Sequence, residues 1–239
     1  DEGESSGEPG AEESEGGDGD GDGDGDPPEY WAVGQDSEML RVNPQGAQDG
    51  YPLNLAAPTD LNDIACRGFE EAWVAGDNGL LLRTSDAGHS WRTLASGTRQ
   101  SLEGIAVSLD GKAWAVGDET VLMSGNAGET WAEHAAAPAR EFVAVDTDEY
   151  GVEAFAIDAQ GAIWWFSTTH AHPIFDAALP LHDIAVAAHG GHIVAVGEQG
   201  HAWTSHDGGA SFEPLDLEVT SDLYGADIST DGQKSGIND

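Results

Sequence analysis

The sequence predicts an all-β fold, a β-propeller whose blades are four-stranded antiparallel sheets, and the spacing of its repeats carries that prediction. An apolar segment that ends in a small polar turn recurs five times, beginning at Trp31, Trp73, Trp114, Phe155 and Val194. Each period of about 40 residues holds four short apolar or alternating segments separated by Gly, Asp and Asn, which is typical of strands in hairpins. Four strands in a period of about that length indicate a propeller blade. A solenoid can repeat at this length too, but a four-stranded meander buries both of its faces only when it packs between neighbouring blades.

The repeats divide the chain into a leader, residues 1–29, and a propeller, residues 30–239. Four blades are expected at about 60–98, 100–139, 141–180 and 181–219, and a fifth from residues 30–58 together with residues 222–230. The first pass starts at its second strand, YWAVG, while LYGADIST near the C-terminus supplies a first strand. We expect these two segments to pair and close a five-bladed ring, because closure removes free sheet edges. Alternatively, DGQKSGIND, which is similar to DGKAWAVGD at 110–118, starts a sixth pass.

The leader is strongly acidic. It contains 13 Asp and Glu residues and neither Lys nor Arg, so it cannot bury enough apolar surface to offset the entropy of ordering, and we expect an extended spacer. Part of it matches the spacing of a calcium-binding loop, at Asp18, Asp20, Asp22, Asp26 and Glu29. Two prolines stand where a flanking helix would begin, so we favour the plain spacer and expect no cofactor, with calcium as the alternative.

Composition excludes several classes of function. The chain has 45 Asp and Glu residues against 8 Lys and Arg, a formal net charge of −37. Such a chain lacks the basic surface that nucleic acids and anionic membranes require, and it favours cationic partners. The single cysteine, Cys66, rules out an internal disulfide or a multi-cysteine zinc site, and its apolar neighbours predict a small core residue. No apolar run reaches the roughly 18 residues of a membrane span.

One phrase is written three times, as SDAGHSW at 85–91, SGNAGETW at 124–131 and SHDGGASF at 205–212. Each copy offers a short polar side chain that can cap its own turn, a glycine suited to positive φ, a hydroxyl and a large aromatic anchor. The positions are Ser85, Asp86, Gly88, Ser90 and Trp91; Ser124, Asn126, Gly128, Thr130 and Trp131; and Ser205, Asp207, Gly209, Ser211 and Phe212. We predict a structural clasp between the third and fourth strands of a blade, because local capping explains every residue without a ligand.

The phrase follows S/T-x-D-x-G-x-S/T-W/F and resembles the Asp-box, or BNR, motif of sialidase-like propellers. With the W-A-V-G-D turns, residues 30–230 resemble the propeller family of photosystem II stability and assembly factors. The resemblance implies that the boxes lie on the outer, non-catalytic side of the blades. Two passes depart from it: the fourth has Thr168 and His170 where Asp and Gly should stand, and the first has Pro44 at the Asp position but keeps Gly46.

Sialidases of similar fold use three arginines, a Tyr nucleophile with a Glu partner and an Asp acid. Here Arg83 directly precedes a box and Arg92 follows its Trp, which places both on outer hairpins instead of around a central funnel. The tyrosines stand in no recognisable catalytic phrase. We therefore predict no catalytic residue.

Histidines and tryptophans offer weaker candidates. Six histidines crowd the fourth and fifth passes, and a seventh lies in the third box: His170, His172, His182, His189, His192, His201 and His206. His170 and His172 have a spacing compatible with a metal, although solvated loop positions are the simpler interpretation. Asp63, Asp183 and Asp227 recur on first strands and should line the central channel. Adjacent Trp164 and Trp165 must point to opposite sides of a strand, so one of them is a candidate partner-binding aromatic unless both are buried between blades.

The sequence thus favours a non-enzymatic propeller that acts as a protein-binding or assembly platform in the cell envelope. Its acidic opening, without Met or signal peptide, indicates a processed, exported chain, periplasmic or extracellular, with the leader as a tether to the envelope. A sialidase-like glycoside hydrolase or glycan-binding lectin is the first alternative. A structural subunit of a larger extracellular assembly is the second.

Overall fold

The computed structural model describes residues 30–42, 48–50, 53, 55, 57–68, 70–228 and 235–238 of the 239-residue chain. The predicted leader with its calcium-loop spacing, and the degenerate box positions Pro44 and Gly46, lie outside these described residues.

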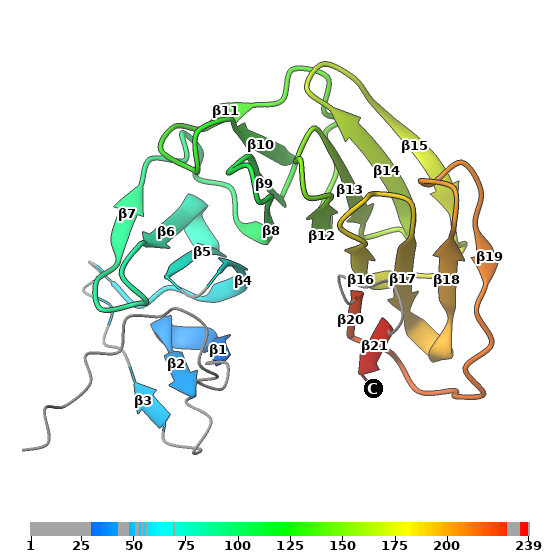
Figure 1. Ribbon diagram of the computed structural model, residues 1–239, viewed down its shortest axis with the longest axis horizontal. Coiled ribbons are helices and arrows are strands. Elements are labelled where there is room, and N and C mark those ends of the chain that lie inside the picture. Colours follow the sequence, from blue (N-terminus) through cyan, green and yellow to red (C-terminus); the bar gives the residue numbers. More distant parts are fainter. Residues whose placement is uncertain are drawn as a thin grey trace, which may run out of the picture.

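Within the described ranges, six antiparallel sheets follow one another along an arc (Figure 1). Blade 1 has three strands, β1 (Tyr30–Val33), β2 (Met39–Val42) and β3 (Gln48–Gly50). Blade 2 has β4 (Leu61–Arg67), β5 (Glu71–Gly76), β6 (Leu80–Thr84) and β7 (Arg92–Leu94). Blade 3 has β8 (Leu102–Val107), β9 (Ala113–Gly117), β10 (Thr120–Ser124) and β11 (Ala132–Glu133).

The C-terminal half continues the pattern. Blade 4 has β12 (Phe142–Thr147), β13 (Glu153–Asp158), β14 (Ala162–Ser167) and β15 (Ala171–Asp176). Blade 5 has β16 (Leu181–Val186), β17 (Ile193–Gly197), β18 (Ala202–Ser205) and β19 (Glu213–Pro214). The last sheet is the terminal hairpin of β20 (Gly225–Ile228) and β21 (Ser235–Asn238). The predicted β-propeller of four-stranded antiparallel blades is confirmed.

The C-terminal strand differs from the expectation of ring closure. In the described part of the chain, no sheet joins β20 to β1; β20 pairs with β21 and packs against β16 and β17. First strands contact each other from blade to blade along the inside of the arc, β4 to β8, β8 to β12 and β12 to β16, and β20 extends that series (Figure 1). The strand β21 forms a hairpin with β20, as the first two strands of a blade do. This arrangement corresponds to the alternative in which the C-terminal segment starts a sixth pass of the repeat.

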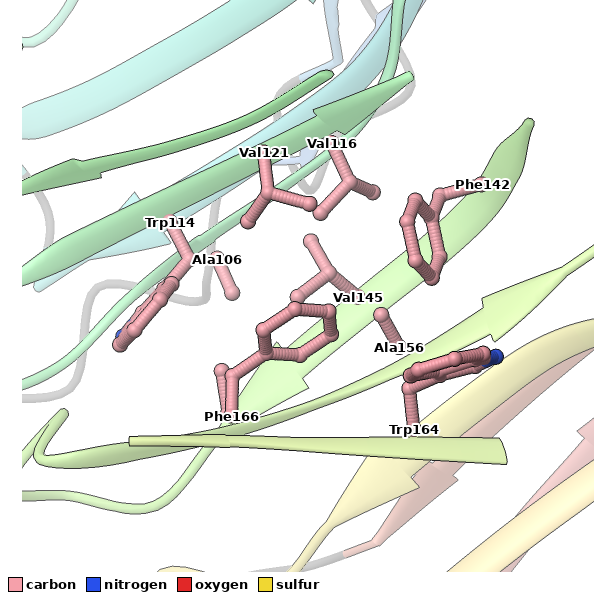
Figure 2. Close-up of a cluster of buried hydrophobic side chains, with 10 residues drawn as sticks. Ala106, Trp114, Val116, Val121, Phe142, Val145, Ala156, Trp164 and Phe166 are labelled. Carbon is pink, nitrogen blue, oxygen red and sulfur yellow. The ribbon is translucent and has the colours of Figure 1, made fainter. Parts of the chain in front are cut away.

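The core lies between blades rather than inside any one of them. Second strands are buried on both faces, since all five residues of β9 and all five of β17 are buried. Figure 2 shows one interblade layer, in which Trp114 of blade 3 shares a cluster with Phe142, Trp164 and Phe166 of blade 4. Because successive strand residues point to opposite faces, each blade contributes to two such layers.

Antiparallel order gives each blade two different ends. One end, called the box face here, carries the loops between first and second strands and those between third and fourth strands. The other end, the turn face, carries the second-to-third turns, among them η1 (Gln35–Ser37), η2 (Asp77–Gly79) and η3 (Glu198–Gly200), together with the connections between blades. Backbone hydrogen bonds join neighbouring loops at both ends, such as Ala127 N to Gly111 O at the box face and Asp118 N to Ser101 O at the turn face.

Cys66 is exposed, so the prediction of a small core residue is wrong. The residue before it, Ala65, packs into the layer between blades 2 and 3, and strand alternation turns Cys66 the other way. There it lines a cavity of about 50 Å³ with Trp31 of blade 1. Blade 1 places no first strand beside β4 among the described residues, which leaves the thiol uncovered.

Candidate functional site

The three repeated phrases form the same hydrogen-bonded turn. A hydroxyl oxygen on Thr84, Ser124 or Ser205 accepts the N–H of the box glycine at 2.9 Å in each copy. The hydroxyl donates to Oδ1 of the Asp or Asn two residues later, at 2.7, 3.0 and 2.9 Å respectively. That Oδ1 also accepts the backbone N–H of Ser90, Thr130 or Ser211 at 2.9 to 3.0 Å. In the first box, hydrogen bonds to the ionised carboxylate lower the pKa of Asp86 to about 2, and the bond from the Ser90 hydroxyl has the largest effect.

In the first box the participating hydroxyl belongs to Thr84 and not to Ser85. The first phrase therefore begins at Thr84, one residue before the Ser85 that the sequence pattern indicated. Thr84 ends β6 with a buried side chain, whereas Ser85 is exposed. Ser124 and Ser205, which end their own strands, occupy the same place as Thr84.

This difference gives a first prediction. Thr84→Val keeps the shape of the side chain but leaves the buried N–H of Gly88 without its acceptor, so we expect a loss of about 1–3 kcal/mol in the free energy of unfolding. Ser85→Ala, one residue along, should stay within about 0.5 kcal/mol of the parent chain. Urea unfolding followed by tryptophan fluorescence measures both, and equal effects would contradict the assignment.

Each box also contacts the blade before it. Gly128, with φ of 75°, lies so close to Trp73 that an added Cβ would be 2.7 Å from the indole Nε1, which donates to Ala127 O at 3.0 Å. Gly88 meets Trp31 and Gly209 meets Phe155 in the same way. The box aromatics join these layers, and Trp91 packs edge-on to Trp31 with ring centroids 5.5 Å apart. The phrase and the W-A-V-G segment one period earlier are therefore two halves of one interblade contact.

Blade 4 replaces its box by other contacts. Ser167 accepts the N–H of His170 in a short turn, and β15 is six residues long where β7 has three and β11 and β19 have two each. The Nε2 of buried His134 lies 2.7 Å from Ser167 O, and its ring packs against Phe166. Trp114 donates to Gly151 O at 3.1 Å instead of to a box. An imidazole and a longer strand thus hold the blade that lacks the motif.

Half-buried carboxylates tie consecutive first strands together. Oδ2 of Asp63 accepts the N–H of Ile105 at 2.7 Å, that of Asp146 accepts Val186 N–H at 2.7 Å and that of Asp183 accepts Ala226 N–H at 2.8 Å. The other oxygen of each accepts the N–H of the following residue. Burial raises the pKa of Asp63 to about 6 and of Asp146 to about 7, and it raises that of Asp183. Both oxygens are occupied by backbone donors, so these groups bind blades together.

Asp227, which the sequence predicts to line the central channel, lies close to two of these carboxylates, Asp146 and Asp183. It lies on β20, where it is exposed, and its charge contributes to the raised pKa values of Asp146 and Asp183. Asp146 was not singled out from the sequence. Its signal was an acidic residue in an otherwise apolar first strand, FVAVDT, two positions beyond the place of Asp63 and Asp183.

The arginines do not assemble a substrate site. Arg83 pairs with Glu71 and with Glu129 of the next blade, and Arg92 pairs with the same Glu129. These groups surround Trp73 at the interface of blades 2 and 3, where the Arg83 guanidinium lies 5.0 Å from the ring centroid. The expected placement on outer hairpins agrees with these contacts.

The tryptophan and histidine candidates occupy separate environments. Trp164 is buried in the layer between blades 3 and 4, while Trp165 packs into the layer between blades 4 and 5. The ring of His172 packs at a tilt of 51° against Trp165, with ring centroids 5.0 Å apart, whereas the Nδ1 of His170 lies 2.8 Å from Thr169 Oγ1. Across the described ranges, no three His, Cys, Asp or Glu side chains converge as a metal site.

The turn face holds an open depression between blades 3 and 4. Its volume is about 610 Å³, and it is lined by Gln100, Asp118, Glu119, Ala139, Arg140, Glu141 and Gln160. Arg140 is held by Asp158, with 2.9 Å between Nη1 and Oδ2. Nearby, burial and the charges of Asp118, Asp77 and Glu141 raise the pKa of Glu103. The surface around the depression is polar, open and acidic.

The chain is 36% identical over 63 residues to the photosystem II stability/assembly factor HCF136, chloroplastic, of Arabidopsis thaliana. The chain is a propeller that resembles this assembly factor. The match covers 26% of this chain and 16% of the relative, well under two thirds of its length. No protein-family model matches the chain.

Solved structures support the fold. YCF48 from Cyanidioschyzon merolae superimposes with a TM-score of 0.65 at 17% identity, covering 87% of this chain and 76% of that one. A chain of the nidogen/laminin complex gives 0.67 at 13% identity, covering 88% and 85%. An ancestral GH74 enzyme gives 0.66 at 12% identity, covering 86% of this chain and 32% of the enzyme. At these identities the likeness establishes the propeller fold alone.

None of the helices in the described ranges combines the length and apolarity that a membrane crossing requires.

Proposed function

We propose that this chain is a non-enzymatic β-propeller that holds a protein partner on its turn face, as a binding or assembly platform exported to the cell envelope. The observation that carries the proposal is the division between two sets of carboxylates. Those with the most perturbed pKa values, Asp63 and Asp146, have both oxygens bonded to backbone N–H groups. Of those that line the depression, Glu119 and Glu141 are exposed and Asp118 is half-buried.

The partner's contacting segment should be basic and polar. Three carboxylates surround the depression, and its one lining arginine is already paired with Asp158. A formal charge of −37 would speed the approach of a cationic partner and strengthen its contact at low salt. Residues 1–29, whose composition predicts an extended spacer, would tether the propeller to the envelope. The similarity to a photosystem II assembly factor supports a platform of this kind.

The test is the mass of the native complex, released gently from the source envelope. We expect a defined mass well above that of the chain alone, and a partner that dissociates as salt is raised. A chain carrying Asp118→Asn, Glu119→Gln and Glu141→Gln should then lose at least tenfold in affinity for that partner. The matched control neutralises exposed carboxylates on the box face, with Glu70→Gln and Asp110→Asn, and should bind as the parent chain does.

Other outcomes would favour the alternatives. A chain that is released alone and that hydrolyses a glycoside, with turnover lost on changing one carboxylate, would establish the sialidase-like hydrolase. Glycan binding without turnover would indicate the lectin. Many copies in fixed ratio within one large particle would indicate a structural subunit.

A further inference from the structure

Two histidines of blade 5 face each other through the same ring nitrogen. His192 ends the loop before β17, and His206 lies in the third box, at the same end of the blade. Their Nδ1 atoms are 2.9 Å apart, and the rings are nearly perpendicular, at 80°. A backbone hydrogen bond also joins the two segments, since Gly208 N donates to Gly191 O at 3.1 Å. Both side chains are exposed.

A carboxylate stands behind one of the rings. Oε1 of Glu213 lies 3.6 Å from the Nε2 of His206, on the side away from His192. A carboxylate there favours the tautomer that carries its proton on Nε2, which leaves the lone pair of Nδ1 directed at His192. Metal-binding histidines commonly have such an arrangement, with one nitrogen toward the ion and the other toward a carboxylate.

We propose that the Nδ1 atoms of His192 and His206 together bind one divalent transition-metal ion of the zinc, nickel or copper class, with water completing its coordination and Glu213 orienting His206. Two nitrogens at about 2.0–2.1 Å from a tetrahedral ion lie about 3.3 Å apart. The present 2.9 Å is slightly less, and small rotations of two exposed rings supply the difference. Imidazole nitrogen is a good ligand for these three metals and a poor one for calcium or magnesium.

The site goes beyond the proposed function, because it lies on the box face and not on the turn face where the partner is placed. An ion there would cross-link the loop before β17 to the box of the same blade. It would therefore stabilise the folded chain by binding it in preference to the unfolded chain.

The experiment uses the full chain, stripped of metal by a chelator, and titrates it with Zn²⁺ alone in a calorimeter. We expect one histidine-dependent Zn²⁺ site, whose affinity falls at least tenfold in His192→Ala and in His206→Ala. Glu213→Gln should weaken binding by about tenfold, the scale of an orienting carboxylate. Affinity should also fall in acid, since protons compete for the same nitrogens.

Two exposed histidines provide the controls. His189, in the same loop, pairs with Glu149 at 2.8 Å, and His201 lies on the turn face. His189→Ala and His201→Ala should bind Zn²⁺ as the parent chain does, and any Zn²⁺ held by the acidic residues 1–29 is common to all variants. Metal-free urea unfolding establishes that each variant is folded. Equal Zn²⁺ affinity and stoichiometry in the parent chain and in folded His192→Ala would overturn the proposal.

Discussion

Replacing Gly128 by alanine is expected to lower the free energy of unfolding by about 2–5 kcal/mol. The residue has φ of 75°, a conformation that costs an alanine about 1–2 kcal/mol. Its added Cβ would stand 2.7 Å from Nε1 and 3.1 Å from Cδ1 of Trp73, which is fully buried and cannot retreat. Moving the indole would also break its hydrogen bond to Ala127 O.

Gly125, three residues earlier in the same box, is the matched control. An alanine there has no atom within 4 Å of its new Cβ and no positive φ to maintain, so we expect a change of at most about 0.5 kcal/mol. Urea midpoints, with the slope checked for two-state behaviour, give both values. If the two variants unfolded at the same urea concentration, the contact between box and preceding blade would not be a constraint on this fold.

The repeat pattern predicts most of the fold because each blade is built from local signals. Strand alternation, turn residues and the spacing of about 40 residues place β4 to β19 in their blades. Sequence periodicity carries less information about the ends of the arc. A first strand such as β20 offers the same apolar face to a blade on either side, so the residues alone allowed both ring closure and a sixth pass.

The contacts between blades are where sequence reasoning was incomplete. The box was interpreted as a local clasp, and its hydrogen bonds are indeed local, but the glycine and the aromatic of each box also meet the preceding blade. Trp73 stands 55 residues before Gly128, so no short-range pattern links them. The available signal was that a Trp or Phe begins the W-A-V-G segment one period before each complete box. The role of Thr84 is hard to predict for a different reason. The adjacent Ser85 also carries a hydroxyl, but its side chain points to the opposite side of the chain and does not reach the Gly88 N–H that Thr84 accepts.

Raising the pH from 5 to 7 is expected to lower the stability of the protein, and Asp146 should account for a measurable part of the slope. Burial raises the pKa of Asp146 to about 7, from the model-peptide value of 3.8. Between these two values the folded chain keeps a proton that the unfolded chain has lost. Stability therefore falls as pH rises through this window, by at most about 1.4 kcal/mol per pH unit for each such group. Asp63, with a pKa of about 6, acts in the same direction over the lower part of the window.

Asp146→Asn isolates this contribution. Its amide cannot replace both carboxylate oxygens as acceptors for Val186 N–H and Thr147 N–H, so the variant should be less stable at every pH. The decisive quantity is instead the slope of unfolding free energy against pH between 5 and 7, which should become shallower than in the parent chain. Exposed Asp110→Asn should leave the slope unchanged. Groups with lowered pKa values, such as Asp86 at about 2, act only below pH 4 and with the opposite sign, since their contribution is lost as pH falls. An unchanged slope in Asp146→Asn would mean that this carboxylate stays ionised where it bridges blades 4 and 5, with its two backbone donors outweighing the cost of burial.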